Sequence, residues 1–172
     1  MKSFPSKTCR AVLFVLICLS GIISCNRKSA QQRAEFTRAN STAFFTAVKQ
    51  DDEAAVKELL TRGFNVNLQD EYGFTGLMYA VQSGYTQLSR RLISAKPEID
   101  LPNKKGATAL MIACDARQKE LAELLIKQGA DLDAQTLNGV TALMIATLAG
   151  YDEIIDLLLA EKPTLKKLIS VE

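Results

Sequence analysis

The stretch that decides the fold runs from residue 106 to residue 135 and reads GATALMIACDARQKELAELLIKQGADLDAQ. Its opening glycine can adopt a positive φ in a turn, and Thr108 is of a type that caps helices through its hydroxyl. Leu110 and Ala113 follow three residues apart, which places both on one face of a first helix. A second helix has the same kind of apolar stripe, at Leu121, Leu124 and Leu125. The stretch therefore predicts two short amphipathic helices joined by turns.

This pattern recurs along the chain with a period of 33 residues. The recurring residues are Thr42, Thr75, Thr108 and Thr141; Phe44, Leu77, Leu110 and Leu143; Ala47, Ala80, Ala113 and Ala146; and Asn40, Gly73, Gly106 and Gly139. One two-helix unit is too small to bury its own apolar face, so stacking of units must supply the core. We expect four units in a domain over residues 40–172, at 40–72, 73–105, 106–138 and 139–172.

The period and the motif resemble the ankyrin repeat, whose consensus reads G-x-T-P-L-H-x-A, then a glycine, then a second helix ending L-L-x-x-G-A. The resemblance implies an all-α ankyrin-repeat solenoid, in which each repeat is a helix-turn-helix with a β-hairpin loop. Two consensus residues are replaced throughout. Proline gives way to Gly76, Ala109 and Ala142, and histidine gives way to Met78, Met111 and Met144. We interpret the methionines as core packing rather than as a soft-metal site, and Cys114 as a buried, unreactive thiol.

Composition excludes several kinds of site. The chain has no histidine, which excludes a Ser-His-Asp triad, a Cys-His pair and a His-ligated metal. Cys114 is the one cysteine after residue 25, so that part of the chain has no internal disulfide or CxxC pair. Three of the 21 bases and none of the 19 acids precede residue 25, which leaves 18 bases against 19 acids, or −1. We expect no metal, no cofactor and no nucleic-acid partner.

Residues 1–24 have the layout of a secretory signal peptide, with Lys2, Lys7 and Arg10 preceding the apolar run AVLFVLICLSGII at 11–23. As a helix this run would span roughly 20 Å, short of the ~30 Å of a bilayer core. A cleaved signal is therefore favoured over a permanent transmembrane helix.

The run ends in Ile22-Ile23-Ser24-Cys25, which resembles the lipobox of bacterial lipoproteins. The resemblance implies lipidation of the Cys25 sulfur, cleavage before Cys25 and acylation of the new amino terminus. Such an anchor would hold the protein stably on a membrane of the bacterial envelope. Residues 25–39 would carry the lipid and form a flexible tether. The inner membrane, the outer membrane and the cell surface remain open, as does a secreted or periplasmic protein without an anchor.

In ankyrin-like stacks the hairpin tips and the first helices form the surface that contacts partners. Carried over position by position, the resemblance implies partner-binding residues at Glu71, Tyr72, Phe74, Gln82, Lys104, Lys105, Asp115, Leu137, Asn138, Val140 and Leu148. The other residues at these places are Lys49, Gln50, Ser83, Ala107, Ala116 and Ala149. For Phe74 and Val140, exposure and packing against neighbouring hairpins are both open.

The function expected from these features is protein binding by a monomer at the envelope, as a scaffold or as an immunity-type inhibitor. The remote alternative is an enzyme that uses Glu120 and Glu123 as acid and base, but both are expected on a solvated outer helix among lysines. After the last unit, Leu165, Leu168 and Ile169 form a short apolar stripe. We expect a brief terminal helix there that covers the fourth unit.

Overall fold

The fold is given by a computed structural model that describes residues 40–161. The signal peptide, Cys25, the tether and the expected terminal helix lie outside the described residues. The helices cover residues 40–49, α2 (Glu53–Thr61), α3 (Gly76–Ser83), α4 (Thr86–Ser94), α5 (Ala109–Asp115), α6 (Lys119–Lys127), α7 (Ala142–Ala149) and α8 (Asp152–Ala160). Within these residues the fold is all-α, as expected, and the hairpin loops contain no strand beyond one isolated antiparallel bridge between Gln69 and Thr75.

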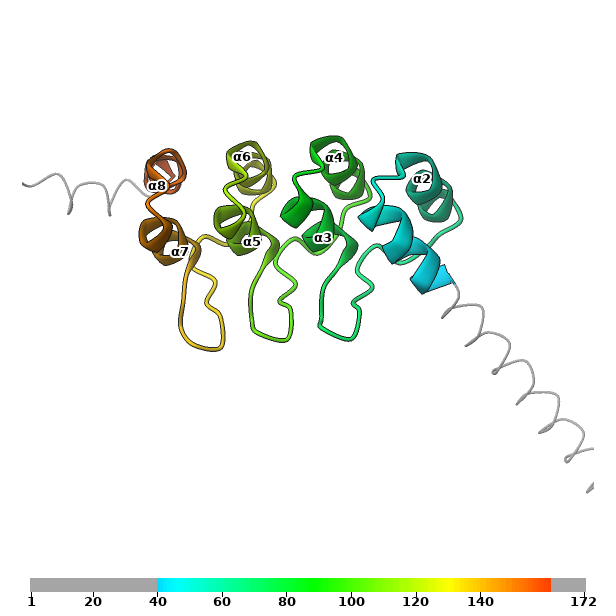
Figure 1. The fold of residues 1–172 in the computed structure, drawn as a ribbon, viewed down its shortest axis with the longest axis horizontal. Coiled ribbons are helices and arrows are strands. Elements are labelled where there is room, and N and C mark those ends of the chain that lie inside the picture. The colour runs from blue at the N-terminus through cyan, green and yellow to red at the C-terminus, as the bar shows by residue number, and fades with distance from the viewer. Residues whose placement is uncertain (1–39, 162–172) are drawn as a thin grey trace, which may run out of the picture. The chain divides into compact units, whose positions relative to one another are not determined.

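The helices form two rows (Figure 1). The inner row holds the helix over 40–49, α3, α5 and α7, and the outer row holds α2, α4, α6 and α8. Each inner helix packs on its own outer helix and on the inner helices beside it, such as α5 on α3 and on α7. The hairpin loops hang from the inner row like fingers (Figure 1). We call residues 68–75, 101–108 and 134–141 the first, second and third fingers.

The core lies between the rows and between successive units. Phe44, Leu77 and Leu110 are at most 2% exposed, and the alanines three residues after them are also buried. Because an alanine side chain is one methyl group, it lets the neighbouring helices approach closely. The periodic apolar residues are therefore the core, as the period of 33 predicts.

Threonine caps two of the inner helices through its hydroxyl. Thr75 Oγ1 accepts from Met78 N at 3.2 Å, and Thr141 Oγ1 accepts from Met144 N at 3.3 Å. The expectation fails in the other two units. Thr108 is the N-cap of α5, but its buried hydroxyl has no hydrogen-bond partner among the described residues. Thr42 lies inside the helix over 40–49, because that helix already includes Asn40, which stands where later units have the turn glycine.

Each finger is closed at its base by a polar residue that the periodic pattern did not single out. Asp70, Asn103 and Thr136 recur at the 33-residue step. Each side chain accepts from the backbone amide four residues later, at 2.8, 3.0 and 3.1 Å respectively. Each backbone amide also donates to the carbonyl of that same later residue. Short polar side chains that bind their own backbone in this way stabilise turns.

Neighbouring fingers are joined backbone to backbone. Lys104 N donates to Tyr72 O at 3.1 Å, and Leu137 N donates to Lys105 O at 3.0 Å. A Cβ atom on Gly73 or Gly106 would lie 2.7 Å from a backbone nitrogen of the next finger. Both glycines also have φ near +80°. The first two fingers thus need glycine for the turn itself and for the approach of the neighbouring finger.

Gly106→Ala should therefore destabilise the protein more than Gly139→Ala. Gly139 has φ +75°, so its alanine variant carries the left-handed cost of about 1–2 kcal/mol. A Cβ at Gly139 would meet only the Gln135 side chain, at 4.0 Å. Gly106→Ala adds a backbone clash, for which we expect a further ~1–3 kcal/mol. Urea denaturation of the two variants measures the difference, and equal losses would show that the close approach is not what requires glycine.

Candidate functional site

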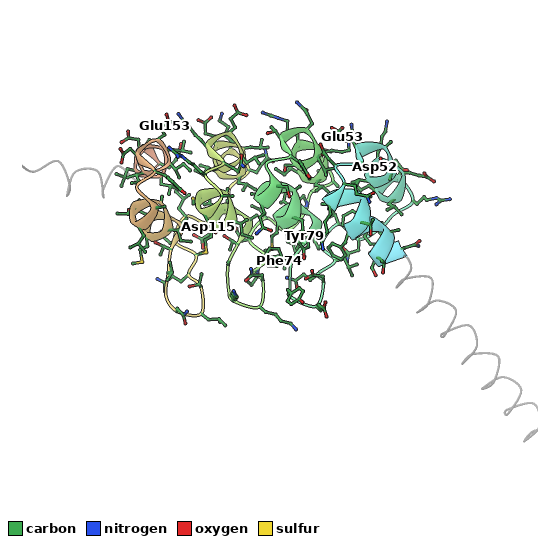
Figure 2. All side chains as sticks on the ribbon, in the orientation of Figure 1. Asp52, Glu53, Phe74, Tyr79, Asp115 and Glu153 are labelled. Carbon is green, nitrogen blue, oxygen red and sulfur yellow. The ribbon has the colours of Figure 1, made fainter. Side chains whose placement is uncertain are left out.

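The candidate site is the surface formed by the fingers and the exposed ends of the inner helices (Figure 2). Most of the residues selected from the sequence are exposed there. These are Glu71, Tyr72, Gln82, Lys104, Lys105, Asp115, Leu137, Asn138 and Leu148. Tyr72 is 62% exposed, Leu137 79% and Leu148 86%. Phe74 and Val140 are half-buried.

The first finger folds back onto its own inner helix. The Phe74 ring packs at a tilt on the Tyr79 ring of α3, with 5.1 Å between ring centroids. The Tyr79 hydroxyl donates to Asp70 Oδ2 at 2.7 Å, so the base of the finger is joined to α3 by an aromatic contact and a hydrogen bond. Figure 2 labels Phe74 and Tyr79 at this junction. Phe74 therefore positions the first finger and is less available as a free contact residue.

Tyr79 also connects the first finger to the first unit. Its ring lies edge-on to Phe45 at 6.0 Å, and Lys49 Nζ lies 4.2 Å from its centroid. Sequence reasoning missed both Tyr79 and Phe45. A signal was present, because the corresponding positions in later units are Ile112 and Ile145, so an aromatic residue with a hydroxyl stands out at this place.

The Asp70–Tyr79 pair has perturbed ionisation. Burial raises the pKa of Asp70, but the hydrogen bonds from the Tyr79 hydroxyl and two backbone amides, with the nearby Lys49 charge, leave that pKa below its usual value. Burial, together with the hydrogen bond to the Asp70 carboxylate and its charge, raises the pKa of Tyr79 to about 12. At neutral pH the pair is thus a carboxylate acceptor and a protonated phenol donor, an arrangement that holds the finger in place.

Tyr79→Phe should raise the pKa of Asp70 towards its usual value and cost about 1 kcal/mol at pH 7. Because the folded-state pKa of Asp70 is depressed, this stabilisation is present above the unfolded value of about 3.9 and is lost as pH falls through the folded value. The difference between wild type and variant should therefore vanish in acid. Denaturation from pH 7 to pH 2 measures it. Tyr85→Phe is the control, since the Tyr85 hydroxyl makes only a 3.4 Å contact to Lys49 O, and an equally pH-independent loss in both variants would contradict the assignment.

One palm position per unit forms a row along the inner helices. The residues are Lys49, Gln82, Asp115 and Leu148, each 33 apart and all exposed. Their chemistry changes from a cation to an amide, an acid and an apolar side chain. A partner lying along this row would therefore meet a different group at every unit, which is the kind of patterning that gives specificity.

The fourth unit is the apolar end of the surface. The large apolar side chains exposed among residues 40–161 are Tyr72, Leu137, Met144 and Leu148, and three of these four belong to the third finger and α7. Met144 corrects the expectation that all three repeat methionines are core. Met78 and Met111 are each 1% exposed, whereas Met144 is 52% exposed, because no described residue packs on α7 from the far side.

The described residues support none of the catalytic or metal alternatives. Glu120 is exposed, and Glu123 pairs with Lys127 at 3.8 Å, as expected of a solvated face. Residues 40–161 contain no cluster of His, Cys, Asp or Glu side chains suited to a metal ion. Burial, with a smaller effect of the Asp115 charge, raises the pKa of the Cys114 thiol to about 12, so this fully buried cysteine is protonated and unreactive. None of the helices between residues 40 and 161 is long and apolar enough to cross a membrane.

A family model described as ankyrin repeats (3 copies) matches the chain twice, over residues 11–103 and 77–167. The two matches together include every helix in the described residues and both rows of Figure 1. A comparison with curated proteins found no match to the chain.

Proposed function

The chain belongs to the ankyrin repeat family, and we propose that it binds a protein partner with its fingers and palm row while a lipid on Cys25 holds it at the bacterial envelope. Repeats of this family act as scaffolds for protein–protein interaction, because the stacked units present one extended surface. The proposal is thus a binding function and not catalysis.

The observation that carries the binding proposal is the separation of framework from surface. The turn glycines, the finger-closing residues and the buried leucines recur unit by unit, whereas the exposed tips differ. The first finger presents Glu71 and Tyr72, the second Lys104 and Lys105, and the third Leu137. Because adjacent fingers share backbone hydrogen bonds, these side chains stand on a preorganised support, which lowers the entropy cost of binding.

The strongest contacts should come from the large apolar side chains that stand free of the core. Tyr72, Leu137 and Leu148 are each more than 60% exposed, and binding energy concentrates in such residues once a partner excludes water from them. The lysines of the second finger would steer an acidic partner at a distance. The partner most consistent with this surface has an apolar patch facing the fourth unit and an acidic patch facing the second finger.

Replacing Tyr72, Leu137 and Leu148 together by alanine should weaken binding by at least ~2 kcal/mol. Pull-down with the wild-type protein identifies the partner, and titration of purified partner then gives the affinities. The control is a triple alanine variant at Lys57, Arg90 and Glu120, which are exposed on the outer helices. Wild-type affinity in the first triple, or a comparable loss in the control, would place the interface on another face of the stack.

The anchor is supported by the residue pattern at 22–25 alone, because the first family match begins inside the apolar run, at residue 11. The basic start, the apolar run of 13 residues and the cysteine at its end together favour a lipoprotein signal. More than one acyl chain would make attachment stable. A scaffold for an envelope enzyme and an inhibitor of a toxic protein are both consistent with an anchored binding domain, and the partner's identity decides between them.

Cys25→Ala should abolish incorporation of labelled palmitate and leave a precursor that is uncleaved or cleaved elsewhere. Cys114→Ala is the matched control, since that thiol is fully buried and should not carry lipid. Labelling of wild type and both variants, followed by immunoprecipitation, distinguishes the outcomes. Label that persists in Cys25→Ala, or is missing from the wild type, would refute the anchor and leave the binding proposal standing.

A further inference from the structure

The far side of α7 is a surface that every earlier inner helix buries. Three positions of the repeat show this. Leu77 and Leu110 are at most 2% exposed, Met78 and Met111 are 1% exposed, and Val81 and Cys114 are fully buried. In the fourth unit Leu143 is only half-buried, whereas Met144 and Thr147 are exposed. We call Leu143, Met144 and Thr147 the end face.

The difference arises from the neighbour and not from the helix itself. α5 packs on α3, and α7 packs on α5, and these contacts cover the methionines of α3 and α5. No described helix follows α7. Leu148 is not part of this effect, because the corresponding Gln82 and Asp115 are exposed even where a further unit follows. The end face is therefore an uncovered unit–unit contact, distinct from the palm row.

The end face offers an occupant apolar contact and almost no hydrogen bonding. Its one polar side chain, Thr147, donates through Oγ1 to Leu143 O at 2.7 Å, so the hydroxyl is already paired with its own helix. Together with Val140 and Leu148 at its rim, the end face lines an apolar groove of about 420 Å³. The occupant should thus be a short apolar stripe rather than a polar or charged peptide.

The sequence after α8 supplies such a stripe at the right place in the repeat. Leu165 continues the 33-residue series of Val66, Ile99 and Leu132. Val66 is buried, and Ile99 and Leu132 pack partly buried against the core. At this position each earlier unit sends the chain back towards the next inner helix. The second family match also extends past α8, to residue 167.

Two further features match this segment to the fourth unit. Leu165, Leu168 and Ile169 fall three and four residues apart, so a helical turn would place them on one face, with Lys166 and Lys167 away from it. α8 has acidic residues in its first turn and no basic residue in its last. Lysines beyond its C-terminus would complement both that charge and the helix dipole.

We propose that residues 165–169 dock through this stripe on the end face of the same chain. The segment takes the place that α5 and α7 take on the inner helices before them, and so closes the core without a fifth unit. The link from Glu161 to Leu165 is short, which gives the segment a high effective concentration at the end face compared with any separate molecule. This inference does not depend on the proposed protein partner or on the lipid.

The three repeat methionines provide the test, because oxidation of methionine by peroxide follows exposure. In the full chain, kept without detergent in whichever cell fraction contains it, Met144 should oxidise nearly as slowly as Met78 and Met111. Combined Leu168→Asp and Ile169→Asp should accelerate oxidation of Met144 by about tenfold, which corresponds to about 1.4 kcal/mol of docking free energy. Peptide mass spectrometry measures all three sites, and continued protection of Met78 and Met111 shows that the stack is folded.

The matched control is Lys166→Asp with Lys167→Asp, which changes the charge of the same segment but leaves the stripe intact. Met144 should stay protected in this variant to within a few-fold. Three results would overturn the proposal. Met144 could oxidise rapidly in the wild type. Its protection could survive Leu168→Asp with Ile169→Asp, which would indicate a different protein as occupant. Its protection could also weaken as expression is lowered, which would indicate a second copy of the chain.

Discussion

The structure depends on one constraint, which is that a single two-helix unit cannot bury its own apolar face. Leu110 reaches 1% exposure only because α5 has a neighbour on either side, α3 and α7. The same requirement sets the 33-residue step, since units must match if the surface of one is to cover the next. It also predicts trouble wherever a neighbour is missing, and α7 is where the described residues show it.

The fingers meet a second requirement, which is to project from the stack without becoming mobile. A side chain at the base of each finger binds the backbone four residues later, and each finger also bonds to the next through its backbone. None of these bonds uses the side chains at the tips. Tip residues can therefore vary while the support is preserved, which explains why binding chemistry collects at Tyr72, Lys104 and Leu137.

The first finger shows how far position in a repeat can be carried over as function. Phe74 occupies a tip position, yet it packs on Tyr79, and Tyr79 binds Asp70. The pattern that found Phe74 carries no information about what lies beside it. Tyr79 was passed over because it sits at a position that is apolar in later units, where Ile112 is buried and Ile145 is half-buried.

The sequence by itself determined the all-α stack, the helix pairs and the buried leucines and alanines. Those features repeat every 33 residues, and repetition of glycine, threonine, leucine and alanine is legible without coordinates. Only the tertiary structure decided which members of a periodic set behave alike. Met78, Met111 and Met144 are the same residue at the same position, and Met144 alone is exposed. The physical reason is that burial belongs to the pair of surfaces in contact, and a local pattern describes only one of them.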